Sequence, residues 1–311
     1  MKTTNVTKET DQRFDFSAPT RKTALLCCNG FQMTDIHDCT AMAEYFKNSF
    51  ADDYPNCEIV SVSLFEPADK KTHKAKHFEE VLDETINDYI DKGYDIVLLG
   101  YSFSASLAAK LQVRYHTHIR KLILVAPVYD TIVNNMIPGY IKYVLKFRKL
   151  KKKYGKEVSK AMGRTTTKGM IGLLLSILRS VLKCRKYFDD VDCNTVIIRG
   201  TDDNLCGEHS IKKVRKDMEC PNILYTYEKM NHGIMKSVRL NGAVFEDILH
   251  YSFGTPHLLQ TNTTLLAAKP VEQKVKLDED GQPIPTFADI FSEIDSDEDE
   301  YETYRQNEEA M

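Results

Sequence analysis

A serine flanked by small residues stands where an apolar run gives way to a helical pattern. Residues 98–105 read LLGYSFSA. A strand-to-helix turn that exposes a serine needs small residues on both sides, because strand and helix pack closely there. Gly100 meets this need, whereas Ser104 stands where the motif Gly-x-Ser-x-Gly of such a turn has its second glycine. The pattern predicts that Ser102 is a nucleophile, and the alternative is a serine that only caps the helix.

A serine hydroxyl becomes an effective nucleophile when a base accepts its proton and an acid orients that base. Two later segments offer such groups. Residues 196–203 read VIIRGTDD, a strand that ends in Gly-x-x-Asp, and residues 225–233 read YTYEKMNHG, a strand followed by His232. Catalytic groups of open α/β sheets gather at the carboxyl ends of the strands. A histidine in a plain surface turn is the alternative for His232.

Apolar strands alternate with helical patterns through most of the chain, which predicts an α/β fold with a mostly parallel central sheet and helices on both faces. The expected strands cover residues 23–28, 58–65, 95–99, 121–126, 195–199 and 223–227. The expected helices cover residues 35–50, 77–91, 103–114, 210–218 and 244–251. We expect a polar N-terminal segment over residues 1–20, a main domain over 21–253 and a tail over 254–311.

The order of these motifs resembles the α/β-hydrolase superfamily, especially its lid-bearing members that are like lysophospholipases and monoacylglycerol lipases. The resemblance spans Thr23 to Phe253. It implies that Ser102 is the nucleophile, Asp203 the acid and His232 the base of a Ser-His-Asp triad. Asp202 is the nearest alternative for the acid. Asp130 is a weaker one, because some members place the acid after the preceding strand.

The resemblance also implies an oxyanion hole made of two backbone N–H groups. One belongs to Phe103, the residue after the nucleophile. The other belongs to the loop after the first core strand, where residues 29–31 read NGF and Phe31 is the expected donor. Asn29 stands where the family commonly has histidine, an exchange that a backbone donor tolerates.

Residues 131–188 are predicted to form a helical lid inserted in the main domain. Fifteen lysines and arginines and one glutamate lie between Lys142 and Lys186. A basic amphipathic helix can contact an anionic membrane surface, and a solvated face packed on the lid is the alternative. The apolar stretch 170–178 suggests an acyl pocket, for which we expect Leu174, Ile177 and Tyr101 to contact substrate.

The net charge of −3 conceals a segregation, because thirteen acidic residues and one basic residue lie between Leu277 and Met311. This composition predicts a disordered tail, which either folds back onto the basic lid or serves only solubility. No nucleic-acid-binding motif accompanies the basic residues, and the motifs predict no cofactor. The eight cysteines show no zinc-ligand spacing, which predicts no metal site. Several lie inside apparent strands, which predicts reduced core thiols in a cytoplasmic protein. No apolar segment of secretory type follows the N-terminus.

These patterns predict a hydrolase that cleaves a small acyl ester through an acyl-enzyme intermediate. A thioesterase or an acyltransferase would use the same groups. A protein of this fold that has lost catalysis and acts as a binding module is the alternative from another class. The sequence does not determine the substrate, the acyl-chain length or the oligomeric state.

Overall fold

We analysed a computed structural model of the 311-residue chain. The structure describes residues 6–9, 21–31, 39–66, 69–129, 167–203, 206–235 and 238–254. The predictions for residues 130–166 and for the tail after residue 254 lie outside these ranges. They include the basic residues from Lys142 to Arg164, the acidic tail and the alternative acid Asp130.

A seven-stranded sheet in the order β3-β2-β4-β5-β6-β7-β1 forms the centre of the molecule. All neighbouring strands are parallel except β1, which pairs antiparallel with β7. The strands are β1 (Val6–Lys8), β2 (Thr23–Cys28), β3 (Cys57–Val62), β4 (Asp95–Tyr101), β5 (Ile119–Val125), β6 (Asn194–Gly200) and β7 (Asn222–Tyr227). The predicted mostly parallel α/β architecture is confirmed.

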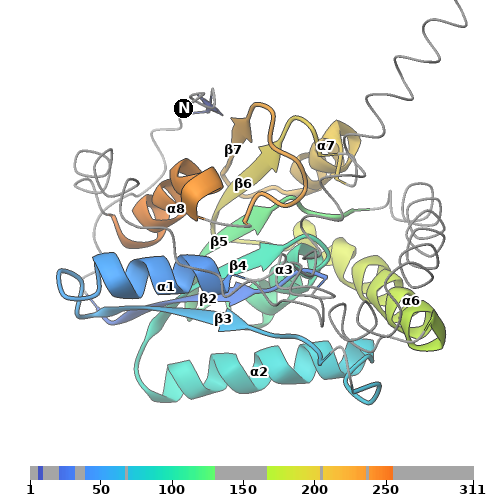
Figure 1. Cartoon of the computed structure of the whole chain (residues 1–311). Coiled ribbons are helices and arrows are strands. Elements are labelled where there is room, and N and C mark those ends of the chain that lie inside the picture. The colour runs from blue at the N-terminus through green and yellow to red at the C-terminus, as the bar shows by residue number, and fades with distance from the viewer. Residues whose placement is uncertain are drawn as a thin grey trace, which may run out of the picture.

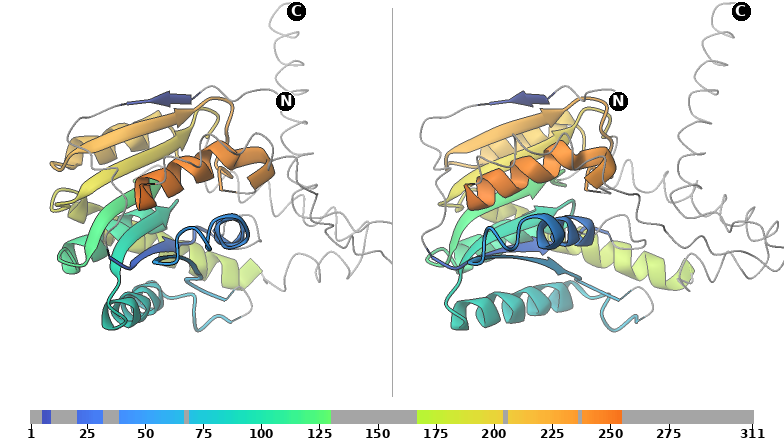
Figure 2. Two further views of the ribbon diagram at one scale, coloured as in Figure 1. Left: turned by 90° about the vertical axis from the view of Figure 1, so that its left-hand side faces the viewer. Right: turned by 60° about the vertical axis from the view of Figure 1, so that its left-hand side comes forward.

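Helices cover both faces of this sheet (Figures 1 and 2). They are α1 (Thr40–Ser49), α2 (Ala75–Asp91), α3 (Ser104–Arg114), α6 (Thr167–Cys184), the short 3₁₀ helix η2 (Arg185–Phe188), α7 (Glu208–Asp217) and α8 (Val238–Phe253). Helices α1 and α8 contact each other, while α6 packs against α2 and α3. Among the described helices, none has both the length and the apolar character that crossing a membrane requires.

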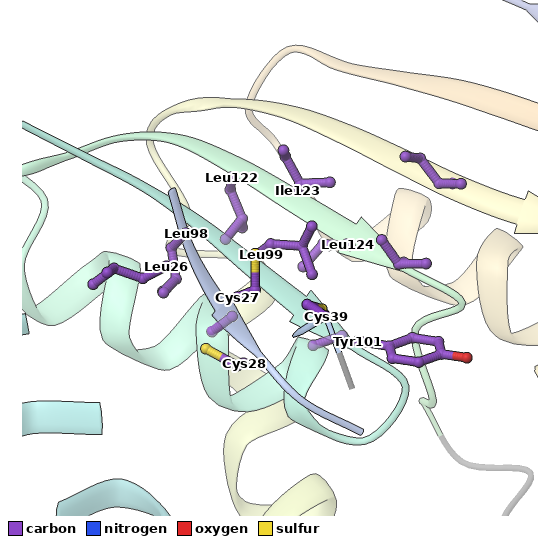
Figure 3. Packing of buried hydrophobic residues seen from close by; sticks show 14 of the residues in the cluster. Leu26, Cys27, Cys28, Cys39, Leu98, Leu99, Tyr101, Leu122, Ile123 and Leu124 are labelled. Carbon is purple, nitrogen blue, oxygen red and sulfur yellow. The ribbon is translucent and has the colours of Figure 1, made fainter. Parts of the chain in front are cut away.

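The central strands β2 and β4 lie in the core and carry almost only apolar side chains. All six residues of β2 are buried, and in β4 only Asp95 is partly exposed. A strand covered on both faces cannot alternate polar and apolar residues, which explains the continuous apolar runs. Figure 3 shows Cys27, Cys28 and Cys39 packed among the leucines of these strands. All eight cysteines of the chain are free thiols.

Part of the polar N-terminal segment pairs with the central sheet. Residues 6–8 form the edge strand β1, with Val6 opposite Tyr227 in the register. Lys8 forms an ion pair with Asp247, and the next residue, Glu9, accepts two hydrogen bonds of 2.9 Å from Arg215. The polar composition concealed this strand, because an edge strand gains backbone hydrogen bonds without needing apolar side chains.

Several predicted boundaries also shift, those of α8 and β3 among them. Helix α8 begins at Val238, six residues before the predicted start, and β3 ends at Val62 rather than at Phe65. Phe65 is nevertheless buried, because its ring packs against Phe78. Burial without strand pairing therefore explains why the apolar pattern runs beyond β3.

Candidate active site

Ser102 lies on the turn between β4 and α3 in a backbone conformation that side chains rarely adopt. Its φ of 61° falls in the left-handed region, where a residue other than glycine is strained. Hydrogen bonds hold the turn in place. The Ser102 N–H donates to the Val125 carbonyl at 2.8 Å, and the Ser102 carbonyl accepts from Ala105 at 3.2 Å. Strain of this kind persists only where the surroundings enforce it, and it tends to mark functional sites.

Gly100 allows the strand and helix to approach each other behind the serine. A Cβ atom at this position would lie 2.6 Å from Cα of Ala105 and 2.8 Å from Cβ of Ala108. Gly30, on the loop after β2, also lies near the turn but is less crowded. A Cβ atom there would lie 3.3 Å from Cβ of Ser102. Packing therefore requires glycine at position 100, whereas a side chain at position 30 would push its neighbours by a few tenths of an ångström.

Ser104, in place of the usual second glycine, uses its hydroxyl to hold the turn. The Tyr101 N–H donates to Ser104 Oγ at 2.8 Å. The same hydroxyl lies 2.8 Å from the Cys28 carbonyl and 2.9 Å from the Tyr101 carbonyl. Ser104 is wholly buried. The departure from glycine is therefore a structural element of this turn, a role that the sequence pattern did not reveal.

The structure brings Ser102, His232 and Asp203 into one hydrogen-bonded row. His232 Nε2 lies 2.9 Å from Ser102 Oγ, and His232 Nδ1 lies 2.9 Å from Asp203 Oδ2. An ionised carboxylate only accepts hydrogen bonds, so Nδ1 carries the ring proton and Nε2 is left to accept the serine proton. This arrangement is capable of drawing the proton from Ser102.

Asp203, rather than Asp202, is the carboxylate that faces the histidine. The Asp203 side chain is fully buried, and its second oxygen accepts a 2.7 Å hydrogen bond from the Cys206 N–H. The Asp202 side chain is exposed and accepts a hydrogen bond from the Thr201 hydroxyl at 2.8 Å. The register of β6 explains this choice, because the strand ends at Gly200 and the turn directs only Asp203 inward.

The loop that carries His232 is held against the end of β6 and against Tyr101. A Cβ atom at Gly200 would lie 1.9 Å from the Met230 carbonyl, so this contact requires glycine. The Asp202 N–H donates to the same carbonyl at 3.0 Å. The Tyr101 hydroxyl donates to the His232 carbonyl, and its ring stacks on the imidazole with centroids 5.8 Å apart.

The substrate contact predicted for Tyr101 stays a prediction, and the structure shows this side chain engaged with another part of the protein. Its side chain is wholly buried at the end of β4 (Figure 3) and is engaged with the His232 loop. Burial raises the pKa of its hydroxyl well above the ordinary value, so the group stays a hydrogen-bond donor. Tyr101 positions the histidine, a role for which the sequence offered no signal because the two residues are far apart in the chain.

The loop after β2 is fixed by the side chain of Asn29. Its Oδ1 accepts a 2.9 Å hydrogen bond from the Cys39 N–H, and its Nδ2 donates to Ser61 Oγ at 3.0 Å. The predicted donor Phe31 follows two residues later, where its half-buried ring contacts Phe65. Phe103, the other predicted donor, is the N-cap of α3. The first backbone N–H groups of a helix are free to bind developing negative charge.

The two predicted pocket residues of α6 differ in exposure. Ile177 is buried, whereas Leu174 is partly exposed. Leu175 and Leu182 of the same helix are the exposed ones, at 47% and 46%. The helix therefore packs one apolar side on the body of the protein and presents two leucines to solvent. Contact of Leu174 or Ile177 with a substrate stays a prediction.

Comparison with known proteins shows which fold this site stands on. No protein-family model and no curated protein matches the sequence. Among solved structures, the chain is similar to a lipase-esterase related protein from Clostridium acetobutylicum, with 14% identity, a TM-score of 0.52, and coverage of 80% of this chain and 99% of that one.

Two further structures agree with this likeness. One, described under the metagenome-derived lipolytic enzymes LipS and LipT, has 9% identity and a TM-score of 0.53, covering 79% of this chain and 96% of that one. The other is the peroxisomal alpha-beta-hydrolase Lpx1 from Saccharomyces cerevisiae, with 15% identity, a TM-score of 0.51, and coverage of 96% and 90%. At such identities the likeness shows the fold alone, and the chain has the α/β-hydrolase fold.

Proposed function

We propose that this protein is a serine hydrolase that cleaves a small carboxylic ester. The observation that carries the proposal is the row Ser102–His232–Asp203, with both contacts at 2.9 Å and the serine on a strained turn. Holding a serine in this conformation costs about 1–3 kcal/mol. A serine that only capped the helix would need no such strain. The hydroxyl of Ser102 instead lies within hydrogen-bonding distance of His232 Nε2.

The reaction follows from this geometry. Ser102 Oγ attacks the ester carbonyl carbon while its proton passes to His232 Nε2, and Asp203 stabilises the imidazolium through Nδ1–H. The N–H groups of Phe31 and Phe103 bind the oxyanion. Collapse expels the alcohol, which takes the proton from His232, and leaves an acyl-serine. His232 then removes a proton from water as the water oxygen attacks the acyl carbon. Collapse releases the acid, and Ser102 Oγ takes the proton back from His232. Every group in this scheme belongs to the chain itself.

The test is the hydrolysis of a series of p-nitrophenyl esters from acetate to palmitate. We expect hydrolysis by the wild type and its loss in Ser102→Ala. The chain-length profile would show which acyl chains the site accepts. Equal rates for wild type and Ser102→Ala would contradict the proposal.

Two other activities would use the same groups. A thioesterase or an acyltransferase differs only in the bond attacked or in the acceptor of the acyl group. Because both reactions also require Ser102, the variant Ser102→Ala does not separate them from ester hydrolysis. Matched acyl-thioester substrates and added alcohol acceptors distinguish these cases. A catalytically inactive binding protein is the alternative from another class, and failure of every ester and thioester to turn over would favour it.

We further propose that the protein contacts an anionic membrane surface from the cytoplasm. The exposed leucines of α6 support this, because Leu175 and Leu182 lie seven residues apart, with the exposed cations Arg179 and Lys183 beside them. Apolar and cationic side chains on one helix face suit an anionic interface. The fraction of protein that sediments with phosphatidylserine vesicles should be smaller for the double variant Leu175→Gln/Leu182→Gln than for the wild type. If the wild type bound phosphatidylserine vesicles no better than neutral vesicles, the proposal would be contradicted.

The proposed cytoplasmic location is supported by the cysteines, because eight free thiols agree with a reducing compartment.

A further inference from the structure

A cysteine thiol that the proposed reaction does not use lies beside the acid and the base. Cys206 Sγ, a carboxylate oxygen of Asp203 and a ring nitrogen of His232 all lie within 4.8 Å of one another. Cys206 is 1% exposed and the Asp203 side chain is fully buried, whereas the His232 side chain is 12% exposed. The cluster therefore opens toward solvent only on its histidine side.

Sequence spacing concealed this cluster. Cys206 and Asp203 share one turn, but His232 lies 29 residues beyond Asp203 and arrives from the loop after β7. The backbone N–H of Cys206 donates to Asp203 Oδ1 at 2.7 Å, which holds these two residues together. Two of the three groups are thus fixed relative to each other, and Tyr101 anchors the backbone of the third.

The donor set identifies the ligand class. Thiolate sulfur, imidazole nitrogen and carboxylate oxygen are the three donor types that bind Zn²⁺ in proteins, at about 2.0–2.3 Å. Donors around a tetrahedral zinc ion therefore lie roughly 3.3–3.8 Å apart, so closing the cluster requires movements of about 1 Å. A sulfur donor favours Zn²⁺ and Cd²⁺ over the oxygen-seeking ions Mg²⁺ and Ca²⁺.

We propose that Asp203, Cys206 and His232 form an inhibitory site for a thiophilic divalent cation of the Zn²⁺ type. The inference rests on the proposed function, because it makes the catalytic acid and base two of the three ligands. It extends that function by adding a means of regulation, in which cation binding and ester hydrolysis exclude each other.

Proton positions explain the exclusion. The nitrogen that faces Asp203 is Nδ1, and its lone pair must be free to bind the cation. A neutral imidazole has a single ring proton, so that proton moves to Nε2. Burial raises the pKa of the Cys206 thiol well above its ordinary value, so its proton leaves to solvent only when the cation displaces it. Nε2 then donates a hydrogen bond toward Ser102 and can no longer accept the serine proton. Thiolate and carboxylate balance the two charges of the cation.

The first test measures inhibition in protein freed of metal with a chelator. We expect Zn²⁺ to inhibit ester hydrolysis by the wild type, EDTA to restore it and Mg²⁺ to have no effect. Removing one ligand in Cys206→Ala or Cys206→Ser should raise the Zn²⁺ concentration for half inhibition at least about ten-fold. Each variant is compared with its own metal-free rate, and the buried Cys184 supplies the matched control Cys184→Ser.

The second test does not depend on activity. Cd²⁺ bound to a thiolate gives an ultraviolet charge-transfer band, which we expect in the wild type and in Cys184→Ser but not in Cys206→Ala. The band without any ester hydrolysis would support the cation site and contradict the proposed function. Hydrolysis with equal Zn²⁺ sensitivity in all variants and no Cys206-dependent band would overturn the cation site and leave the proposed function standing.

Discussion

Replacing Ser104 by glycine, which restores the more usual motif around the nucleophile, should weaken this protein. In most proteins a change toward the common motif residue would be expected to be neutral or stabilising. Here the serine hydroxyl accepts a hydrogen bond from the Tyr101 N–H at 2.8 Å and lies 2.8 Å from the Cys28 carbonyl. The substitution removes these contacts inside a site closed to water.

The magnitude follows from the groups left without a partner. A buried N–H deprived of its acceptor costs about 1–3 kcal/mol, so Ser104→Ala should lower the free energy of unfolding by about 2 kcal/mol. Ser104→Gly should cost roughly 1 kcal/mol more, because glycine is a poorer helix former than alanine. Ser106, buried in the next position but one of α3, makes a single 3.2 Å hydrogen bond to the Phe103 carbonyl. Ser106→Ala should therefore cost less than about 1 kcal/mol.

Urea unfolding followed by far-ultraviolet circular dichroism measures these differences, provided the slope of the transition is unchanged. Ester hydrolysis by the Ser104 variants, assayed well below the unfolding transition, should also fall, because the turn that carries Ser102 loses its tie to β2. Equal stability of Ser104→Gly and wild type, or a loss no larger than that of Ser106→Ala, would refute the reasoning.

The remaining predictions concern the acid Asp203, the buried Tyr101 that contacts the His232 loop, and the packing of that loop against Gly200. Asp203→Asn should lower kcat about 10⁴-fold, because an amide stabilises the wrong imidazole tautomer; Asp202→Asn should retain wild-type kinetics, and the reverse result would assign the acid to Asp202. Tyr101→Phe should lower kcat about 10- to 100-fold, because the His232 loop loses a hydrogen bond that positions it, while KM stays unchanged. The shape of the pH profile should also stay unchanged, because burial raises the pKa of the Tyr101 hydroxyl and keeps it protonated throughout. A shifted pH profile would contradict this role. Gly200→Ala should abolish most activity and lower the melting temperature, because its Cβ would lie 1.9 Å from a carbonyl of the His232 loop; a stable and active variant would show that the loop is not confined there.

Most of the sheet could be predicted from the sequence, because buried parallel strands have continuous apolar runs that few other structures produce. The exceptions share a physical cause. The strand β1 has no apolar run, since backbone hydrogen bonds and the Lys8–Asp247 ion pair hold it at the edge. The segment after Val62 has an apolar run without being a strand, since Phe65 is buried by ring packing. An apolar run in the sequence therefore indicates a buried segment. It indicates a strand only where the buried segment also pairs within the sheet.

The candidate site was predictable where a residue follows the end of a strand. Ser102, Asp203 and His232 each do so, and parallel strands bring such positions to one edge. The contacts between them were not predictable, because they join loops that are distant in sequence. Tyr101 against His232, Cys206 near His232, and the Asn29 side chain on Ser61 all depend on the folded arrangement.

The central claim is that Ser102 is an activated nucleophile, and covalent labelling tests it most directly. A fluorophosphonate reacts with a serine hydroxyl only when a neighbouring base makes it nucleophilic, and mass spectrometry of the digested protein locates the adduct. We predict one adduct, on the peptide that contains Ser102, in the folded wild type, with none after denaturation, in Ser102→Ala or in His232→Ala. Absence of an adduct from the folded wild type, or an adduct on another serine, would contradict the account.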